Sequence, residues 1–180
     1  MQEAPNADKC GKKKTSEKRD VTQAFQSIVA APGFRIGIRC TDTEILTLQY
    51  LESGPESPPQ NALAAETARQ LRAYFLDPEF IFDLPLHPSG TAFQRRVWQE
   101  IGQTPCHRTR TYGELAKALR NAPRAVGQAC AANPFPPVVP CHRIIAANGG
   151  IGGFAHQRGG FLLDVKRWLL SHEGCPVAFP

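Results

Sequence analysis

The segment from residue 133 to residue 145 constrains this chain more than any other stretch. It reads Asn-Pro-Phe-Pro-Pro-Val-Val-Pro-Cys-His-Arg-Ile-Ile, so prolines stiffen the approach to a thiol, an imidazole and a guanidinium at Cys141, His142 and Arg143. A buried structural cysteine beside a surface histidine and arginine is one interpretation. A reactive cysteine, however, needs a rigid, water-poor site with a base and positive charge nearby. We therefore interpret Cys141 as a nucleophile.

Length and composition exclude several classes of protein. A chain of 180 residues can hold one domain of ordinary size or two small ones. It contains no run of about 18 apolar residues and no apolar core of a secretory signal at its start, so we expect neither a membrane span nor secretion. Six cysteines are scattered without CxxC spacing. We expect reduced thiols in an intracellular protein.

Charge is divided unevenly along the chain. Residues 1–90 carry 10 Lys and Arg against 12 Asp and Glu, a balance of −2. Residues 91–180 carry 11 against 4, a balance of +7. A basic half of this kind is typical of a protein that meets a polyanion, although a solvated basic surface without a partner has the same composition.

The first half has the pattern of a small α+β unit. Residues 1–33 begin polar and aperiodic, and we expect a flexible tail and lead-in there. Apolar residues alternate over 34–40 and 46–50 across a polar turn, which predicts a β-hairpin. Apolar residues four apart over 63–75 predict an amphipathic helix. Renewed alternation over 80–86 predicts a third strand.

After residue 88 the spacing of the apolar residues changes to the period of an α-helix. We expect helices over 93–101, 112–119, 124–132 and 162–172. Ser89 or Thr91 can open the first, Thr111 and Glu114 have capping-box spacing, and Pro123 suits a first helical position. We place an N-terminal domain over 34–88 and a helical C-terminal domain over 89–180.

The two short helices on either side of Pro123 lie in the basic half. This arrangement predicts a helix-turn-helix, although many helical hairpins bind nothing.

Taken together, these residues resemble the O6-alkylguanine-DNA alkyltransferase family, also called methylated-DNA–protein-cysteine methyltransferases. The resemblance covers roughly residues 34–174. It is carried by several short motifs in the family's order: Phe-Asp-Leu-Pro-Leu from 82, Gly-Thr-Ala-Phe-Gln from 90, Thr-Tyr-Gly-Glu-Leu-Ala from 111, Arg-Ala-Val-Gly from 124, Asn-Pro from 133, Pro-Cys-His-Arg-Ile-Ile from 140, Lys-Arg-Trp-Leu-Leu from 166 and His-Glu-Gly from 172.

The resemblance implies a fold and a reaction. The α+β fold would comprise a small antiparallel sheet with a helix, ribonuclease H-like, followed by a mostly helical domain with a helix-turn-helix. An alkyl group would pass from O6 of guanine, or O4 of thymine, in duplex DNA to the Cys141 sulfur, once per molecule. We expect a monomer without a cofactor. We also expect no metal, because Cys10, Cys40 and His87 lack ligand spacing.

The resemblance also implies a proton relay around the thiol. His142 is the candidate base, acting through a water, because adjacent residues in an extended segment point apart. Glu173 matches the carboxylate that fixes the imidazole tautomer, and a solvated residue at a helix end is the alternative. Since a helix C-terminus disfavours a carboxylate, a specific partner for Glu173 is favoured. Asn133 matches the residue that braces the cysteine, or it is a plain helix cap.

The family's DNA contacts carry over to residues of the basic half. Arg124 matches the arginine finger that fills the place of a flipped base, and an ordinary phosphate contact is the alternative. Tyr112 matches the tyrosine that contacts the flipped base and helps to protonate it, or it is a half-buried core ring. The small residues after Arg124 suit the minor groove. Further DNA contacts are expected at Gly113, Gln94, Ala125, Gln128 and Ala147, and pocket residues at Ile144, Phe154 and Ala155.

The chain departs from the family in two places. Pro-Cys-His-Arg occurs twice, at 105–108 and 140–143, and its apolar setting favours the second copy. The lid over 153–160 is longer than in the family and has Phe154 where the family has tyrosine.

Two other classes of function compete with the alkyltransferase. A helix-turn-helix regulator without chemistry would bind a specific sequence and tolerate Cys141→Ala. A Cys-His hydrolase would turn over repeatedly and would need no basic half. We expect a cytoplasmic protein in a bacterium and a nuclear one in a eukaryote.

Overall fold

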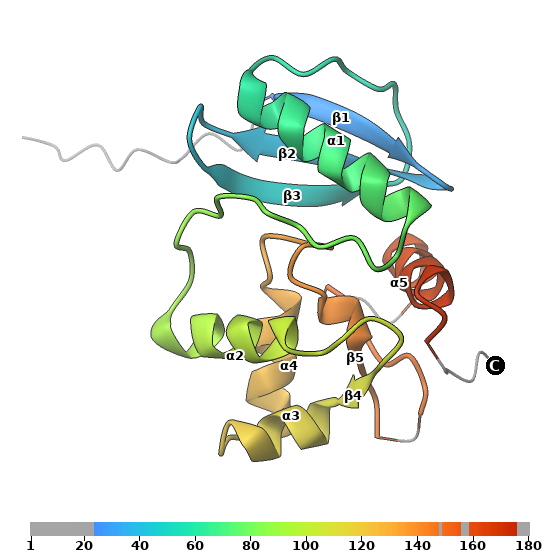
Figure 1. The fold of residues 1–180 in the computed structure, drawn as a ribbon. Coiled ribbons are helices and arrows are strands. Elements are labelled where there is room, and N and C mark those ends of the chain that lie inside the picture. The colour runs from blue at the N-terminus through green and yellow to red at the C-terminus, as the bar shows by residue number, and fades with distance from the viewer. Residues whose placement is uncertain (1–23, 148, 156–158, 176–180) are drawn as a thin grey trace, which may run out of the picture.

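The computed structural model describes residues 24–147, 149–155 and 159–175. Its N-terminal part is a three-stranded antiparallel sheet in the order β1-β2-β3, with one helix against it (Figure 1). The strands are β1 (Ser27–Ala31), β2 (Phe34–Cys40) and β3 (Ile45–Leu51), and helix α1 (Ala62–Leu76) packs against β1 and β2. This arrangement confirms an α+β chain with a small antiparallel sheet.

The sheet corrects two sequence predictions. Residues 27–31 form β1, where the lead-in was expected; this short strand pairs with β2 from Ser27↔Ile38 to Ala31↔Phe34. The third strand expected over 80–86 was wrong. That segment alternates between half-buried and exposed side chains, but it makes only one isolated bridge, Ile45↔Leu86. Pro85 has no N–H to donate, so no ladder forms. Of the tail and lead-in predicted over 1–33, residues 1–23 lie outside the described residues.

Helices and two short strands build the C-terminal part. The helices are α2 (Ala92–Gly102), α3 (Tyr112–Ala118), α4 (Pro123–Ala131) and α5 (Phe161–His172). Strands β4 (Arg110–Thr111) and β5 (Ile144–Ile145) pair in parallel, and a 3-10 turn, η1 (Cys141–Arg143), precedes β5. The four helices predicted for this half are confirmed, as is the helix predicted over 63–75, which is α1.

Local sequence explains where these helices begin. Thr91 and Thr111 each accept from the backbone N–H three residues on, and Gln94 and Glu114 return the bond, so both form capping boxes. Pro123 is the first residue of α4, as expected. None of the helices in the described ranges is long and apolar enough to cross a membrane.

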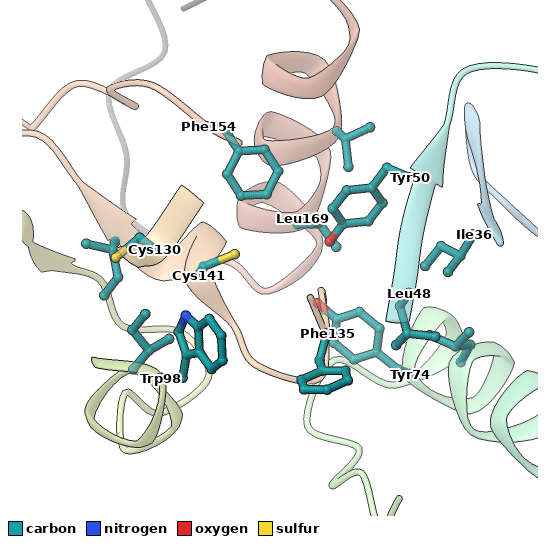
Figure 2. Packing of buried hydrophobic residues seen from close by; sticks show 14 of the residues in the cluster. Ile36, Leu48, Tyr50, Tyr74, Trp98, Cys130, Phe135, Cys141, Phe154 and Leu169 are labelled. Carbon is teal, nitrogen blue, oxygen red and sulfur yellow. The ribbon is translucent and has the colours of Figure 1, made fainter. Parts of the chain in front are cut away.

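One apolar core joins the two parts of the chain. Figure 2 shows Leu48 on the sheet side and Trp98 on the helical side, with Phe135 between them and Cys141 next to Trp98. Strand β3 also bonds directly to the segment that leads to Cys141, because Leu48 N donates to Pro134 O at 2.9 Å and Thr47 Oγ1 donates to it at 3.0 Å. The sheet therefore helps to position the cysteine segment.

Gly90→Ala should destabilise the fold. Gly90 has φ of 77°, and an added Cβ would lie 2.5 Å from Trp98 Cη2, whose ring donates from Nε1 to Ala129 O in α4. We expect the free energy of unfolding, measured by urea denaturation, to fall by about 2 kcal/mol or more. Gly102→Ala is the control, because nothing lies within 4 Å of its added Cβ. Equal stability of the two variants would contradict this role for Gly90.

Candidate active site

Cys141 lies at the start of turn η1 and is 5% exposed. Asn133 Nδ2 donates to Val139 O at 2.8 Å and to Cys141 Sγ at 3.2 Å, while its Oδ1 accepts from Phe135 N. Asn133 thus braces the loop and directs an N–H at the sulfur. We expected residues 141–143 to be extended, and this prediction was wrong. They form a 3-10 turn directly after the proline-rich segment.

Glu173 anchors the site from the C-cap of α5 and is 0% exposed. His142 Nε2 contacts its Oε1 at 2.9 Å, and Arg143 donates from Nε to Oε2 at 2.8 Å and from Nη2 to Oε1 at 2.9 Å. Tyr74 OH in α1 also donates to Oε1, at 2.7 Å. Glu173 is therefore no solvated helix end; it is a buried carboxylate bound by three residues from two other parts of the chain.

The charges around Glu173 fix its ionisation. Burial alone would raise the pKa of Glu173, but hydrogen bonds and charge from His142 and Arg143 hold it well below its usual range. An ionised carboxylate only accepts hydrogen bonds, so His142 carries its proton on Nε2.

His142 is then left with a free lone pair on Nδ1. This atom is buried and has no hydrogen-bond partner within the described part of the chain. Burial lowers the pKa of His142, and Glu173 offsets only part of that effect, so the imidazole is neutral at neutral pH. A neutral ring with Nε2 fixed is a base at Nδ1.

The thiol needs such a base. Burial raises the pKa of Cys141, and the hydrogen bond from Asn133 and the charge of Lys166 oppose that rise only in part. The resting thiol therefore keeps its proton, and a nucleophile forms only when a base accepts it.

Lys166 is a site residue that the sequence analysis missed. It is 0% exposed, and its Nζ donates to Ile144 O at 2.6 Å and to Ile151 O at 2.8 Å. Burial lowers its pKa to about 8. The signal was a lysine within the apolar stripe of α5, between Val165 and Leu169. Lys166 therefore links strand β5 to the loop that follows it, and its positive charge lies near the Cys141 thiol.

A cavity of about 460 Å³ opens on Cys141, a size that suits a small ligand. Tyr112 lies on its wall and donates from its hydroxyl to Gly153 O at 3.1 Å. Burial raises the pKa of Tyr112, which keeps its phenol protonated. The other predicted residues on the wall are Arg124, Gln128, Phe154 and Ala155, and Cys130 lines it as well.

The remaining predicted residues lie away from the cavity wall. Ile144 is fully buried behind Cys141, and Ala125 is half-buried on α4. Gly113 is exposed at the start of α3, and Ala147 is exposed after β5. Gln94 accepts from Thr91 N, so its side chain caps α2. In the lid, residues 156–158 lie outside the described ranges.

The second Pro-Cys-His-Arg copy lies elsewhere. Cys106 Sγ donates to Pro78 O at 3.2 Å and lines a separate hollow. Of the residues weighed as metal ligands, Cys40 contacts Asn61 and His87 contacts Glu44, and Cys10 lies outside the described residues. No cluster of three or more potential metal ligands occurs within 24–147, 149–155 and 159–175.

The helical part is similar to known proteins. Residues 92–175 match the family model described as 6-O-methylguanine DNA methyltransferase, DNA binding domain. A methylated-DNA–protein-cysteine methyltransferase of Methanosarcina mazei is 47% identical over 110 residues, 60% of this chain and 66%, just under two thirds, of that protein. A DNA base-flipping protein of Thermus thermophilus is 42% identical over 124 residues, 67% of this chain and 79% of that protein.

A solved structure extends the similarity to most of the chain. The structure of Mycobacterium tuberculosis OGT in complex with DNA is 33% identical in sequence, with a TM-score of 0.70. The match covers 82% of this chain and 91% of that one. It therefore reaches beyond the helices that build the cavity.

Glu173→Gln should lower the stability of the fold at neutral pH, and it should make that stability depend less on acid pH. Removing the charge leaves the half-buried Arg143 without a counter-ion, so we expect a loss of about 3 kcal/mol at neutral pH by urea denaturation. Because the folded pKa of Glu173 lies below 4.5, its ionised form stabilises the wild type above that pH, and this stability is lost as the pH falls through the lower folded value. The variant should lack this loss.

Asp164→Asn is the matched control on the same helix. Asp164 pairs with Arg167 at 2.7 Å, but its side chain is 69% exposed, so its loss should cost less than about 1 kcal/mol. Similar losses in the two variants would contradict a special role for Glu173.

Proposed function

The chain belongs to the methylated-DNA–protein-cysteine methyltransferase family, and we propose that it repairs DNA by moving an alkyl group from O6 of guanine to the Cys141 sulfur. The observation that carries this proposal is the buried His142–Glu173 pair beside Cys141, whose side chain lines the cavity. A regulator without chemistry needs no such relay. Transfer forms a stable thioether, so each chain reacts once. O4 of thymine is a second substrate of the same chemistry.

The relay makes the nucleophile. The Cys141 thiol passes its proton through a water to His142 Nδ1, and Glu173 stabilises the resulting imidazolium. The electron pair left on sulfur attacks the alkyl carbon, the S–C bond forms, and the C–O6 bond breaks with its electrons on the purine. Tyr112 helps to protonate the leaving purine, since its phenol keeps its proton until then. No metal or cofactor takes part in these steps.

The base must leave the duplex to reach the buried sulfur, which costs a few kcal/mol. Arg124 is exposed at the cavity, second in α4, where it can fill the vacated stack. Helices α3 and α4 act as the helix-turn-helix and enter the minor groove, where the small residues Ala125 and Gly127 permit close approach. Gly113, Gln94, Gln128 and Ala147 provide the surrounding contacts. The finer assignments belong to the same proposal: a ribonuclease H-like unit ending at residue 88, and a monomer on DNA.

Transfer to a single cysteine tests the proposal. Wild-type protein incubated with an O6-methylguanine duplex should gain one methyl group per chain, and peptide mass spectrometry should place it on Cys141. Cys141→Ala should gain none, whereas Cys106→Ala should react as the wild type does, because Cys106 lies outside the cavity. Repeated turnover would instead indicate a hydrolase, and binding without transfer would indicate a regulator.

Arg124→Ala should show whether Arg124 acts in flipping the base out of the duplex or in the alkyl transfer itself. We expect its transfer rate from duplex DNA to fall roughly 10- to 100-fold, because the few kcal/mol of unstacking are no longer offset, while transfer from a single strand changes much less. Single-turnover kinetics on both substrates measures the difference. Arg69→Ala, on α1 and paired with Glu66, is the control and should leave both rates unchanged. Equal losses on the two substrates would make Arg124 an ordinary phosphate contact.

A further inference from the structure

A buried hydroxyl without a protein partner points into the site from the N-terminal sheet. Tyr50 in β3 is 8% exposed, and its hydroxyl has no hydrogen-bond partner within the described part of the chain. Leaving a buried hydroxyl unpaired is unfavourable, and native proteins pair nearly all of them. Such an atom calls for a functional explanation.

The position of Tyr50 supplies one. Figure 2 shows its ring extending from β3 toward Cys141 beside Leu169, and its centroid lies 6.0 Å from the Phe154 ring on the cavity wall. Burial raises the pKa of Tyr50, and charge on Cys141 and Glu173 raises it further, so the phenol lies within electrostatic reach of both ends of the relay. It therefore stays protonated and can donate.

A second unpaired atom belongs to the same relay. His142 follows Cys141 in the chain and bonds to Glu173 through Nε2, which leaves Nδ1 buried and without a partner among the described residues. Tyr50 OH and His142 Nδ1 are thus two buried polar atoms without a partner in the described ranges, one extending toward Cys141 and the other on the residue next to it. One water typically makes about three hydrogen bonds to such groups.

We propose that Tyr50 is a positioning residue of the transfer reaction: its hydroxyl holds the water that carries the proton from Cys141 Sγ to His142 Nδ1. This inference rests on the proposed function and deepens it. The water accepts from Tyr50 and from the thiol and donates to Nδ1. The thiol proton passes to the water, another proton passes from the water to Nδ1, and the electron pair stays on sulfur.

The surroundings suit this role. The ionisable groups that face the relay come from several elements: Tyr74 from α1, Cys106 before β4, Tyr112 from α3, Cys130 from α4, Arg143 beside His142, Lys166 from α5, and Glu173 and Cys175 at its end. Tyr74 already donates to Glu173 and Tyr112 to Gly153 O, so both hydroxyls are occupied. Strand β3 is itself bonded to Pro134 through Leu48, which holds Tyr50 in register with the cysteine segment. Tyr50 is therefore the phenol free to bind the water.

Tyr50→Phe removes only the hydroxyl and tests this role. Peptide mass spectrometry can follow the alkylation of Cys141 by iodoacetamide at neutral pH. We expect the rate of this alkylation to fall about tenfold, which is a modest part of the rate enhancement that general acid–base catalysis supplies. Single-turnover methyl transfer should fall by a similar factor. The rate of alkylation should also rise more steeply with pH than in the wild type, because the thiol must then ionise without the relay. Stability should be unchanged or higher.

Ser57→Ala is the matched control. Its Oγ is also buried without a partner in the described ranges, but Ser57 bridges β1, at the opposite edge of the sheet from β3. We expect both rates to match the wild type. Unchanged rates in Tyr50→Phe, or lower rates that accompany a loss of stability, would overturn the inference. A wild-type chain that reacts with iodoacetamide but not with methylated DNA would refute the proposed function, and the iodoacetamide rates would still decide the role of Tyr50.

Discussion

One buried carboxylate holds this site together. Glu173 at the end of α5 binds Arg143 through two nitrogens, His142 through one, and the hydroxyl of Tyr74 in α1. A carboxylate without these partners could not stay ionised away from water, and the partners without it would be unpaired. The ion pair and the hydrogen bonds therefore depend on each other, and they connect the C-terminal helix, the cysteine turn and the N-terminal helix.

The same interaction decides the chemistry. Because Glu173 accepts from Nε2, the lone pair of His142 lies on Nδ1, and burial keeps the ring neutral. Burial also raises the pKa of the thiol, so in the proposed reaction Cys141 becomes a nucleophile only when His142 accepts its proton. Lys166 stabilises the same region by holding two backbone carbonyls and by placing positive charge near the sulfur.

The N-terminal sheet takes part in this arrangement more than its distance in the sequence suggests. Helix α1, which packs on the sheet, carries Tyr74, and strand β3 bonds to Pro134. The ring of Phe34 in β2 packs against that of Trp168 in α5, with their centroids 5.4 Å apart. The alternation over 80–86 was misread for a related reason. One side of that segment packs against the core, so its side chains alternate as they do in a strand. Its backbone, however, forms only one isolated bridge and no ladder.

The sequence by itself determined what depends on near neighbours. Capping pairs three residues apart, the proline that opens α4, and the thiol beside its histidine were readable because those interactions act within a turn of chain. The family resemblance pointed to Glu173 as the partner of His142, 31 positions away, but only the tertiary structure decided that Tyr74 reaches it across 99 positions and that Lys166 faces inward. Such contacts form when separate elements pack, and no local pattern records which buried polar groups will then face one another.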